Sequence, residues 1–315
     1  MNSRPRTRLA ALCGVTALAT LTTLATATAA TPVLNGGWAP YDRCPVDAAA
    51  MLAADGLDQT PQCVVASSTG GSIKLGRTVV PVGKVNVQFG AIQHSDGTTS
   101  VVAPTSGAIT GDTATVPGGL LGLMCPSSIP VIGPICKALI EDNSLNKITA
   151  TVVSAGAPRD FNQYAAIVPG EPIVTVPIKI KLKNPFLSDN CYIGSNSNPI
   201  LLKPRNAVEP AFAGEIFNGN GTPAPEGEAG DLTRLSFSGS PLTDSTFSVP
   251  GANGCGLLGA IDLAVNLKTG IPAGSGTNSI TLTNAQLGVM APYDATSTAP
   301  NAGQAFSGYW HSAAN

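Results

Sequence analysis

Short runs in which apolar and polar residues alternate are the feature that most constrains the fold of this chain. In the clearest run, from Ile173 to Lys183, the aliphatic residues at even positions from 174 to 182 alternate with Thr, Pro and Lys at odd positions from 175 to 183. A period of two places the two sets on opposite faces of a β-strand, so this run predicts a strand with one buried face. Similar runs bounded by Gly, Pro, Asn or Ser occupy 73–75, 78–80, 85–92, 148–154, 232–238 and 280–289.

Repeated short strands with turn residues between them predict a mainly β fold, built as one or more antiparallel β-sandwiches. The pair Gly76-Arg77 suits a tight hairpin turn between two of these strands. Helical spacing of apolar residues occurs only at Pro134–Asn143 and Gly254–Lys268, which predicts one or two short helices.

The first 30 residues have the pattern of a secretion signal. Three arginines lie within residues 4–8, an apolar run begins at Leu9, and Ala27-Thr28-Ala29 offers a small-x-small cleavage pattern. Threonines within the run, and the lack of a charged flank after it, argue against a transmembrane span. A lipoprotein is also disfavoured, because Leu12 precedes Cys13 where a small residue is needed. We therefore expect a secreted, extracellular protein with cleavage near Ala29 or Ala30.

Removal of this signal changes the charge and the cysteine count. It takes away three of the 17 basic residues and none of the 19 acidic ones, so 14 basic residues remain against 19 acidic ones. A mildly acidic chain has no basic field to neutralise phosphates, which argues against nucleic acid as a partner. It also removes Cys13, which leaves six of the seven cysteines.

An even number of cysteines in an exported chain indicates disulfide bonds. Six cysteines can pair in many ways, and the simplest pairing joins sequence neighbours. No Cys-x-x-Cys pair occurs and no histidine lies near a cysteine, so bridges are favoured over a metal site. The predicted bridges are Cys44 with Cys63, Cys125 with Cys136, and Cys191 with Cys255.

Domain boundaries are weakly marked. The chain from residue 31 could form one large sandwich or two smaller ones. We favour two β-rich lobes packed together, at 31–184 and 185–291, followed by a flexible tail at 292–315 that is rich in Ala, Ser, Thr and Gly. The segment from Asn218 to Gly230 predicts a long exposed loop. The acidic residues of this loop could bind calcium. The loop lacks the regularly spaced Asp and Asn ligands of a calcium site, however, so a solvated acidic loop is favoured.

Four segments of the chain have a distinctive composition: STGGSIKLG at 68–76, PGGLLGL at 117–123, the segment 184–200, and VPGANGC at 249–255. Together they resemble a group of uncharacterised exported proteins from high-GC Gram-positive (actinobacterial) bacteria. The resemblance spans roughly residues 63–289 and implies a secreted, cysteine-bridged, β-rich protein. It also implies a structural role for Cys191 and Cys255, which belong to matching motifs, and it assigns no catalytic residue.

The chain contains only two histidines, so few residues could support histidine-based catalysis. A hydrolase could use His94 as its base, Asp96 to orient it, and Ser95 or Ser100 as nucleophile. Adjacent residues of a strand point to opposite faces, so His94 and its sequence neighbours are poorly placed to act together. The favoured interpretation is that His94 is an exposed histidine beside a turn. His311 is expected to be solvated. The sequence contains no recognised catalytic motif and predicts no cofactor.

Two other features could bind a partner. Lys179, Lys181 and Lys183 would lie about 7 Å apart on one strand face, where they could contact an anionic envelope polymer. The alternative, protection of an edge strand against aggregation, is favoured.

The apolar segment from Gly118 to Ile140 could hold a lipid or another apolar ligand. Its candidate contacts are Leu120, Leu121, Leu123 and Ile132. The favoured alternative is that the Cys125–Cys136 bridge folds the segment over an open end of the sandwich as a plug.

These observations predict a non-enzymatic extracellular or cell-envelope protein with an interaction or structural role. They do not indicate a partner protein. An apolar-ligand carrier is the second hypothesis, and a hydrolase with an unrecognised site is the third.

Overall fold

Three antiparallel sheets form the framework of the computed structural model, which describes residues 32–125 and 129–314. The fold is mainly β, as the alternating runs predict. The expected signal segment, residues 1–30, lies outside the described residues. Within the described residues, no helix is long and apolar enough to cross a membrane.

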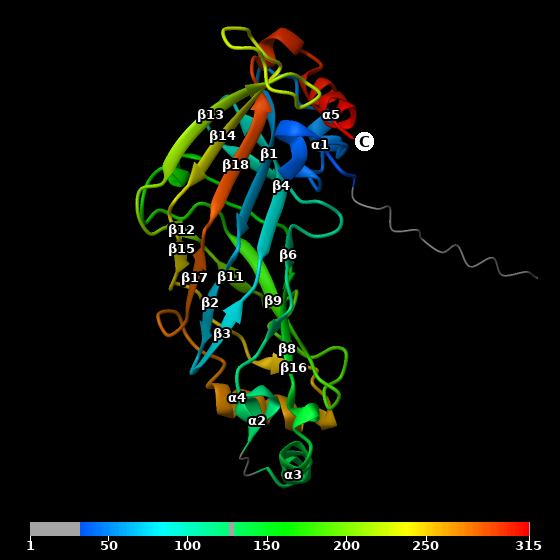
Figure 1. Ribbon diagram of the computed structural model, residues 1–315, viewed down its shortest axis with the longest axis vertical. Coiled ribbons are helices and arrows are strands. Elements are labelled where there is room, and N and C mark those ends of the chain that lie inside the picture. Colours follow the sequence, from blue (N-terminus) through cyan, green and yellow to red (C-terminus); the bar gives the residue numbers. More distant parts are fainter. Residues whose placement is uncertain (1–31, 126–128, 315) are drawn as a thin grey trace, which may run out of the picture. The chain divides into compact units, whose positions relative to one another are not determined.

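The first sheet has the strand order β13-β14-β18-β1-β4-β5, and β6 pairs with the beginning of β4 (Figure 1). It therefore joins strands from both ends of the chain at its centre, where β1 pairs with β18. The bounds of its strands are β1 Gln59–Ser68, β4 Val85–His94, β5 Thr99–Val102, β6 Ile109–Gly111, β13 Ala211–Phe217, β14 Leu232–Ser238 and β18 Gln286–Pro292.

The second sheet has the order β12-β15-β17-β2-β3, and the third has the order β16-β10-β9-β8-β7, with β11 also paired to β9. The strands of the second sheet are β2 Gly70–Leu75, β3 Thr78–Val82, β12 Arg205–Asn206, β15 Leu242–Asp244 and β17 Ser279–Thr283. The strands of the third sheet are β7 Ala114–Thr115, β8 Thr149–Ser154, β9 Val176–Lys183, β10 Tyr192–Ile193, β11 Ile200–Leu202 and β16 Ala252–Asn253.

The first and second sheets are connected by strands that bend rather than end. β1 leads into β2 at Thr69, and β17 leads into β18 through Asn284, whose φ of 49° is left-handed. The two bends are joined, because Asn284 Nδ2 donates to Thr69 Oγ1 at 3.0 Å and the Thr69 amide donates to the Thr283 carbonyl at 3.3 Å. Neighbouring strands therefore change direction together.

One apolar core draws side chains from all three sheets. Val87 and Phe89 of β4, Ile73 of β2, and Ile178 and Ile180 of β9 are buried in a single cluster. The alternation in β9 thus has the predicted effect, since its even-numbered aliphatic residues line this core.

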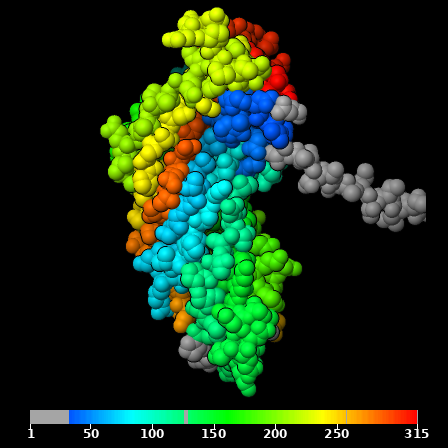
Figure 2. All heavy atoms as spheres, in the orientation of Figure 1, coloured from blue at the N-terminus to red at the C-terminus, as the bar shows by residue number. Residues whose placement is uncertain are grey.

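A second core covers the opposite face of the first sheet. It contains Trp38 from η1 (Gly36–Tyr41), Met51 from α1 (Ala49–Leu52), and Phe306 and Trp310 from α5 (Ala302–Ser312). Figure 2 shows the N-terminal part of this layer, in blue, beside the C-terminal part, in red. Trp310 Nε1 donates to the Tyr41 carbonyl at 2.9 Å, which ties the two ends together.

Two expectations about organisation are wrong. Residues 302–312 form a helix with buried Phe306 and Trp310 rather than part of a flexible tail, because the first sheet offers an apolar face that needs covering. Residues 31–184 and 185–291 are not separate lobes either. Each of the three sheets pairs strands from both halves, and Pro32–Asn315 form one compact unit.

The cysteines pair as neighbours, which confirms the predicted connectivity. Cys44–Cys63 fastens the N-terminal layer to β1. Cys191–Cys255 lies where β10 meets β16. Cys125–Cys136 links the end of α2 (Gly119–Met124) to α3 (Gly133–Glu141).

The described residues contain five short α-helices rather than the expected one or two. The expected helices correspond to α3 (Gly133–Glu141) and α4 (Ala260–Thr269). The additional ones are α1, α2 (Gly119–Met124) and α5.

Candidate functional site

The three lysines predicted to share one strand face lie on β9, which is an interior strand. β8 pairs with one edge of β9, and β10 and β11 pair with the other edge. The favoured interpretation of the lysines as edge protection is therefore wrong. The inner face of β9 is buried, so the lysines lie on its outer face.

The Tyr192 ring organises two of these side chains. Lys179 Nζ lies 4.5 Å from the ring centre and Lys181 Nζ lies 5.9 Å from it, within the range of a cation–π interaction. Tyr192 reaches this position because it pairs directly with Lys181 across β10 and β9. We call Lys179, Lys181, Lys183 and Tyr192 the lysine face.

The lysine face is not neutralised by neighbouring acids. Its cross-strand partners on β8 are uncharged: Val153 faces Lys179, Thr151 faces Lys181 and Thr149 faces Lys183. Within residues 32–125 and 129–314, none of the three lysines forms an ion pair. The face thus presents three positive charges on a chain of net negative charge.

The described parts of the apolar segment, residues 118–125 and 129–140, pack as a plug rather than as an open ligand surface. Leu120, Leu123 and Ile132 are buried in the main core, and Leu121 packs against that core. Leu123 also lines a cavity of about 30 Å³ between the second and third sheets. Since a cavity of this kind needs about 10–15 Å³ to hold one water, it has room for roughly two waters and is too small for an acyl chain.

His94 contacts one of the two serines considered for catalysis. Its Nε2 lies 2.8 Å from Ser100 Oγ across the β4–β5 hairpin. The Asp96 carboxylate instead accepts hydrogen bonds from the amide and hydroxyl of Thr98, and Ser95 bonds to Asp58. The structure therefore brings together His94 and Ser100, but no carboxylate of the described residues is bonded to the imidazole, as a catalytic triad requires.

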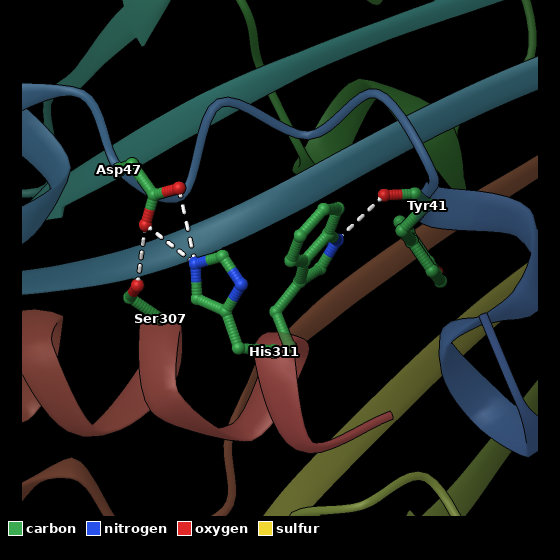
Figure 3. Close-up of polar contacts among 5 residues, drawn as sticks. Tyr41, Asp47, Ser307 and His311 are labelled. Carbon is green, nitrogen blue, oxygen red and sulfur yellow. Dashed lines mark hydrogen bonds and ion pairs between the residues drawn. The ribbon is translucent and has the colours of Figure 1, made fainter. Parts of the chain in front are cut away.

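His311 belongs to a polar cluster that the sequence did not reveal. Its Nε2 lies 2.9 Å and 3.0 Å from the two carboxylate oxygens of Asp47, and Ser307 Oγ donates to the same carboxylate at 2.7 Å (Figure 3). Ser307 and His311 lie one turn apart on α5, so both reach the N-terminal layer.

The order of these three groups is wrong for nucleophilic catalysis. The base of a triad lies between the serine and the acid, whereas here Asp47 lies between Ser307 and His311. The serine proton is directed to the carboxylate, and the imidazole cannot accept it. The cluster instead fastens α5 to the chain segment that precedes α1.

This contact makes the attachment of α5 sensitive to acid. Burial raises the pKa of Asp47, but hydrogen bonds from Ser307 and His311 outweigh it, so the pKa of the carboxyl lies below its ordinary value of 3.8. The stabilisation is therefore present above that value and is lost as the pH falls through the lower pKa of the folded state. We expect acid to loosen α5 at pH values below about 4.

Tryptophan fluorescence measures this loosening, because both tryptophans, Trp38 and Trp310, lie in the second core. The Asp47→Asn variant is the control and should lack this part of the acid transition. Because the Asp47 and His311 side chains are 62% and 53% exposed, the difference should be small, below about 1 kcal/mol. Identical acid transitions in both proteins would contradict the assignment.

The fold and these sites define a disulfide-bonded, antiparallel β protein with a basic outer face on its third sheet. Comparison with protein-family models, with curated proteins and with solved structures found no match.

Proposed function

We propose that this protein is a non-enzymatic extracellular or cell-envelope β-sandwich that binds an anionic envelope polymer through the lysine face. The observation that carries the proposal is the interior position of β9. Because the strand has no free edge to protect, its three unneutralised lysines need another explanation. Binding of a negatively charged partner would explain three lysines in a row on one face of the strand.

The spacing of the charges favours a polymer over a small anion. Alternate residues of a strand are about 7 Å apart, so the lysine face presents a row of cations rather than a convergent pocket. A chain with repeated phosphodiester or carboxylate groups can contact several of them at once. Charges farther apart than about 8 Å are screened at physiological salt, so the negative charge elsewhere on the chain does not prevent local binding.

Export is supported by the disulfide bonds and by the predicted signal segment. Disulfides persist in oxidising compartments such as the cell exterior. A non-enzymatic role is supported by the positions of the two histidines. Each forms a hydrogen bond, His94 within its hairpin and His311 to the N-terminal layer, and neither contact has the order of a catalytic triad.

Neutralising the lysine face should weaken binding to polyanions. Exposed ion pairs contribute about 0.2–1 kcal/mol each, so replacing Lys179, Lys181 and Lys183 with Gln should lower affinity about tenfold. Isothermal titration with polyphosphate and polygalacturonate measures this change, and dextran serves as the neutral polymer. Added salt should also weaken binding of the polyanions to the wild-type protein.

A matched control carries the same change of charge elsewhere. Lys74, Lys137 and Lys268 are exposed lysines of other elements, and their replacement with Gln should leave polymer affinity nearly unchanged. Equal weakening in both triple variants would show that net charge alone matters. That result, or a failure of wild-type protein to bind either polyanion, would overturn the proposal.

A further inference from the structure

A cleft of about 210 Å³ lies beside the first sheet, on the face whose Leu235 and Phe237 contact the main core. Leu235 and Phe237 of β14 form its floor, and Phe212 of β13 lies beside them. Residues of the η4 segment (Tyr164–Ala166) and its flanks form the opposite wall.

Aromatic and aliphatic side chains are unusually exposed around this cleft. Tyr164 is 76% exposed, Phe212 is 59% exposed, and Ile167 is 46% exposed. Phe212 is held by Phe237, with ring centres 5.4 Å apart and planes inclined at 46°. The cleft is thus lined by two solvent-exposed aromatic rings, Phe212, which Phe237 holds on the sheet, and Tyr164 of η4.

Two side-chain amides complete the lining. Gln93 Oε1 accepts a hydrogen bond from Gln62 Nε2 at 2.9 Å, which leaves its own amide hydrogens available. Gln163 lies beside Tyr164 on the opposite wall, and its side-chain amide forms no hydrogen bond with the part of the chain that the structure describes. Among the residues that the structure describes, no Asp, Glu, Lys or Arg lines the cleft.

We propose that this cleft binds a neutral polysaccharide chain of β-linked glucose or N-acetylglucosamine. These sugars carry their substituents equatorially, so each ring has a flat C–H face that packs against an aromatic side chain. Their hydroxyl groups can pair with amides such as those of Gln93 and Gln163. The uncharged lining matches an uncharged chain, and the volume suits one sugar ring at a time.

A purely apolar occupant fits the cleft less well. It would cover the two glutamine amides without giving them hydrogen-bond partners, and burying an unpaired polar group carries a free-energy cost. The cleft also lies on a different sheet from the lysine face, so its ligand does not depend on the proposed binding of polyanions.

Isothermal titration of the wild-type protein with cellohexaose and chitohexaose tests the proposal. We expect one of the two to bind and Tyr164→Ala to weaken that binding about tenfold, because a stacking surface is lost. Gln163→Ala should also weaken it. Tyr293→Ala is the matched control, since Tyr293 is 48% exposed but lies outside the cleft.

Three results would overturn the assignment. They are a failure of both oligosaccharides to bind at millimolar concentration, equal binding by wild type and Tyr164→Ala, and a self-association that Phe212→Ala abolishes while no sugar binds. The last would assign the cleft to a second copy of this chain. Replacing Lys179, Lys181 and Lys183 with Gln should leave oligosaccharide binding unchanged, which separates this proposal from that for the lysine face.

Discussion

Replacing Phe306 with Ala should lower the free energy of unfolding by about 3–5 kcal/mol, the usual cost of truncating a fully buried Phe. Phe306 is 1% exposed, and its ring centre lies 5.1 Å from that of Trp38. The substitution would open a void between α5 and the N-terminal layer, where backbone hydrogen bonds limit how far the chain can collapse. Chemical denaturation followed by tryptophan fluorescence measures the loss.

The same substitution at an exposed position provides the control. Phe212 is 59% exposed, so Phe212→Ala should cost less than about 1 kcal/mol. If the two variants lost similar stability, the C-terminal residues would not be part of the cooperative core. That outcome would restore the expectation of a loosely held tail.

Removing the Cys191–Cys255 disulfide should cost about 4 kcal/mol in the chain-entropy model, because the bridge closes a loop with a sequence separation of 64 residues. Both cysteines are fully buried, so their replacement with Ala also leaves a small void. The bridge lies beside the short pairing of β10 with β16, which only two residues of each strand maintain. Equilibrium denaturation of the Cys191→Ala, Cys255→Ala double variant measures the change.

The Cys125–Cys136 bridge provides the comparison for loop length. Its sequence separation is 11 residues, for which the same model gives about 3 kcal/mol. If removing Cys125–Cys136 lowered the free energy of unfolding as much as removing Cys191–Cys255, or more, the stabilisation by these disulfides would not be mainly entropic. Non-reducing peptide mapping of each variant should show that the remaining cysteines keep their partners.

Strands with one exposed face could be located from the sequence. β14 begins and ends at the predicted residues, 232 and 238, and β8 and β9 lie within their predicted ranges. β1 could not be located this way, because its neighbours and the layers above and below bury residues 61–65 in succession. Burial on both faces removes the alternation from which a strand is predicted.

Gln88 illustrates the same limit for a single side chain. The alternation in β4 places it on a polar face, yet it is 2% exposed. Its amide donates to Asp42 at 2.7 Å, and its oxygen accepts from the Arg43 amide at 2.9 Å. The N-terminal layer, folded back over β4, supplies these partners, and nothing near Gln88 in the sequence indicates them.

The candidate sites also contain features that the sequence predicts and features that it does not. The lysine row could be predicted, because a strand's period of two places alternate residues on one face wherever the strand lies. The role of Tyr192 and the interior position of β9 could not, since both depend on pairing with other strands. The aromatic cleft joins residues 93, 163–167, 212 and 235–237, which no local pattern connects.

The amino-acid sequence by itself determined the mainly β class and several strand ranges, which follow from local periodicity. It left the cysteine pairing open, but its simplest option, between sequence neighbours, is the one that the structure has. Tertiary structure alone decided that the chain forms one unit, that α5 covers the first sheet, and that the lysines lie on an interior strand. These depend on contacts between segments far apart in the chain, where burial of apolar surface outweighs local preference.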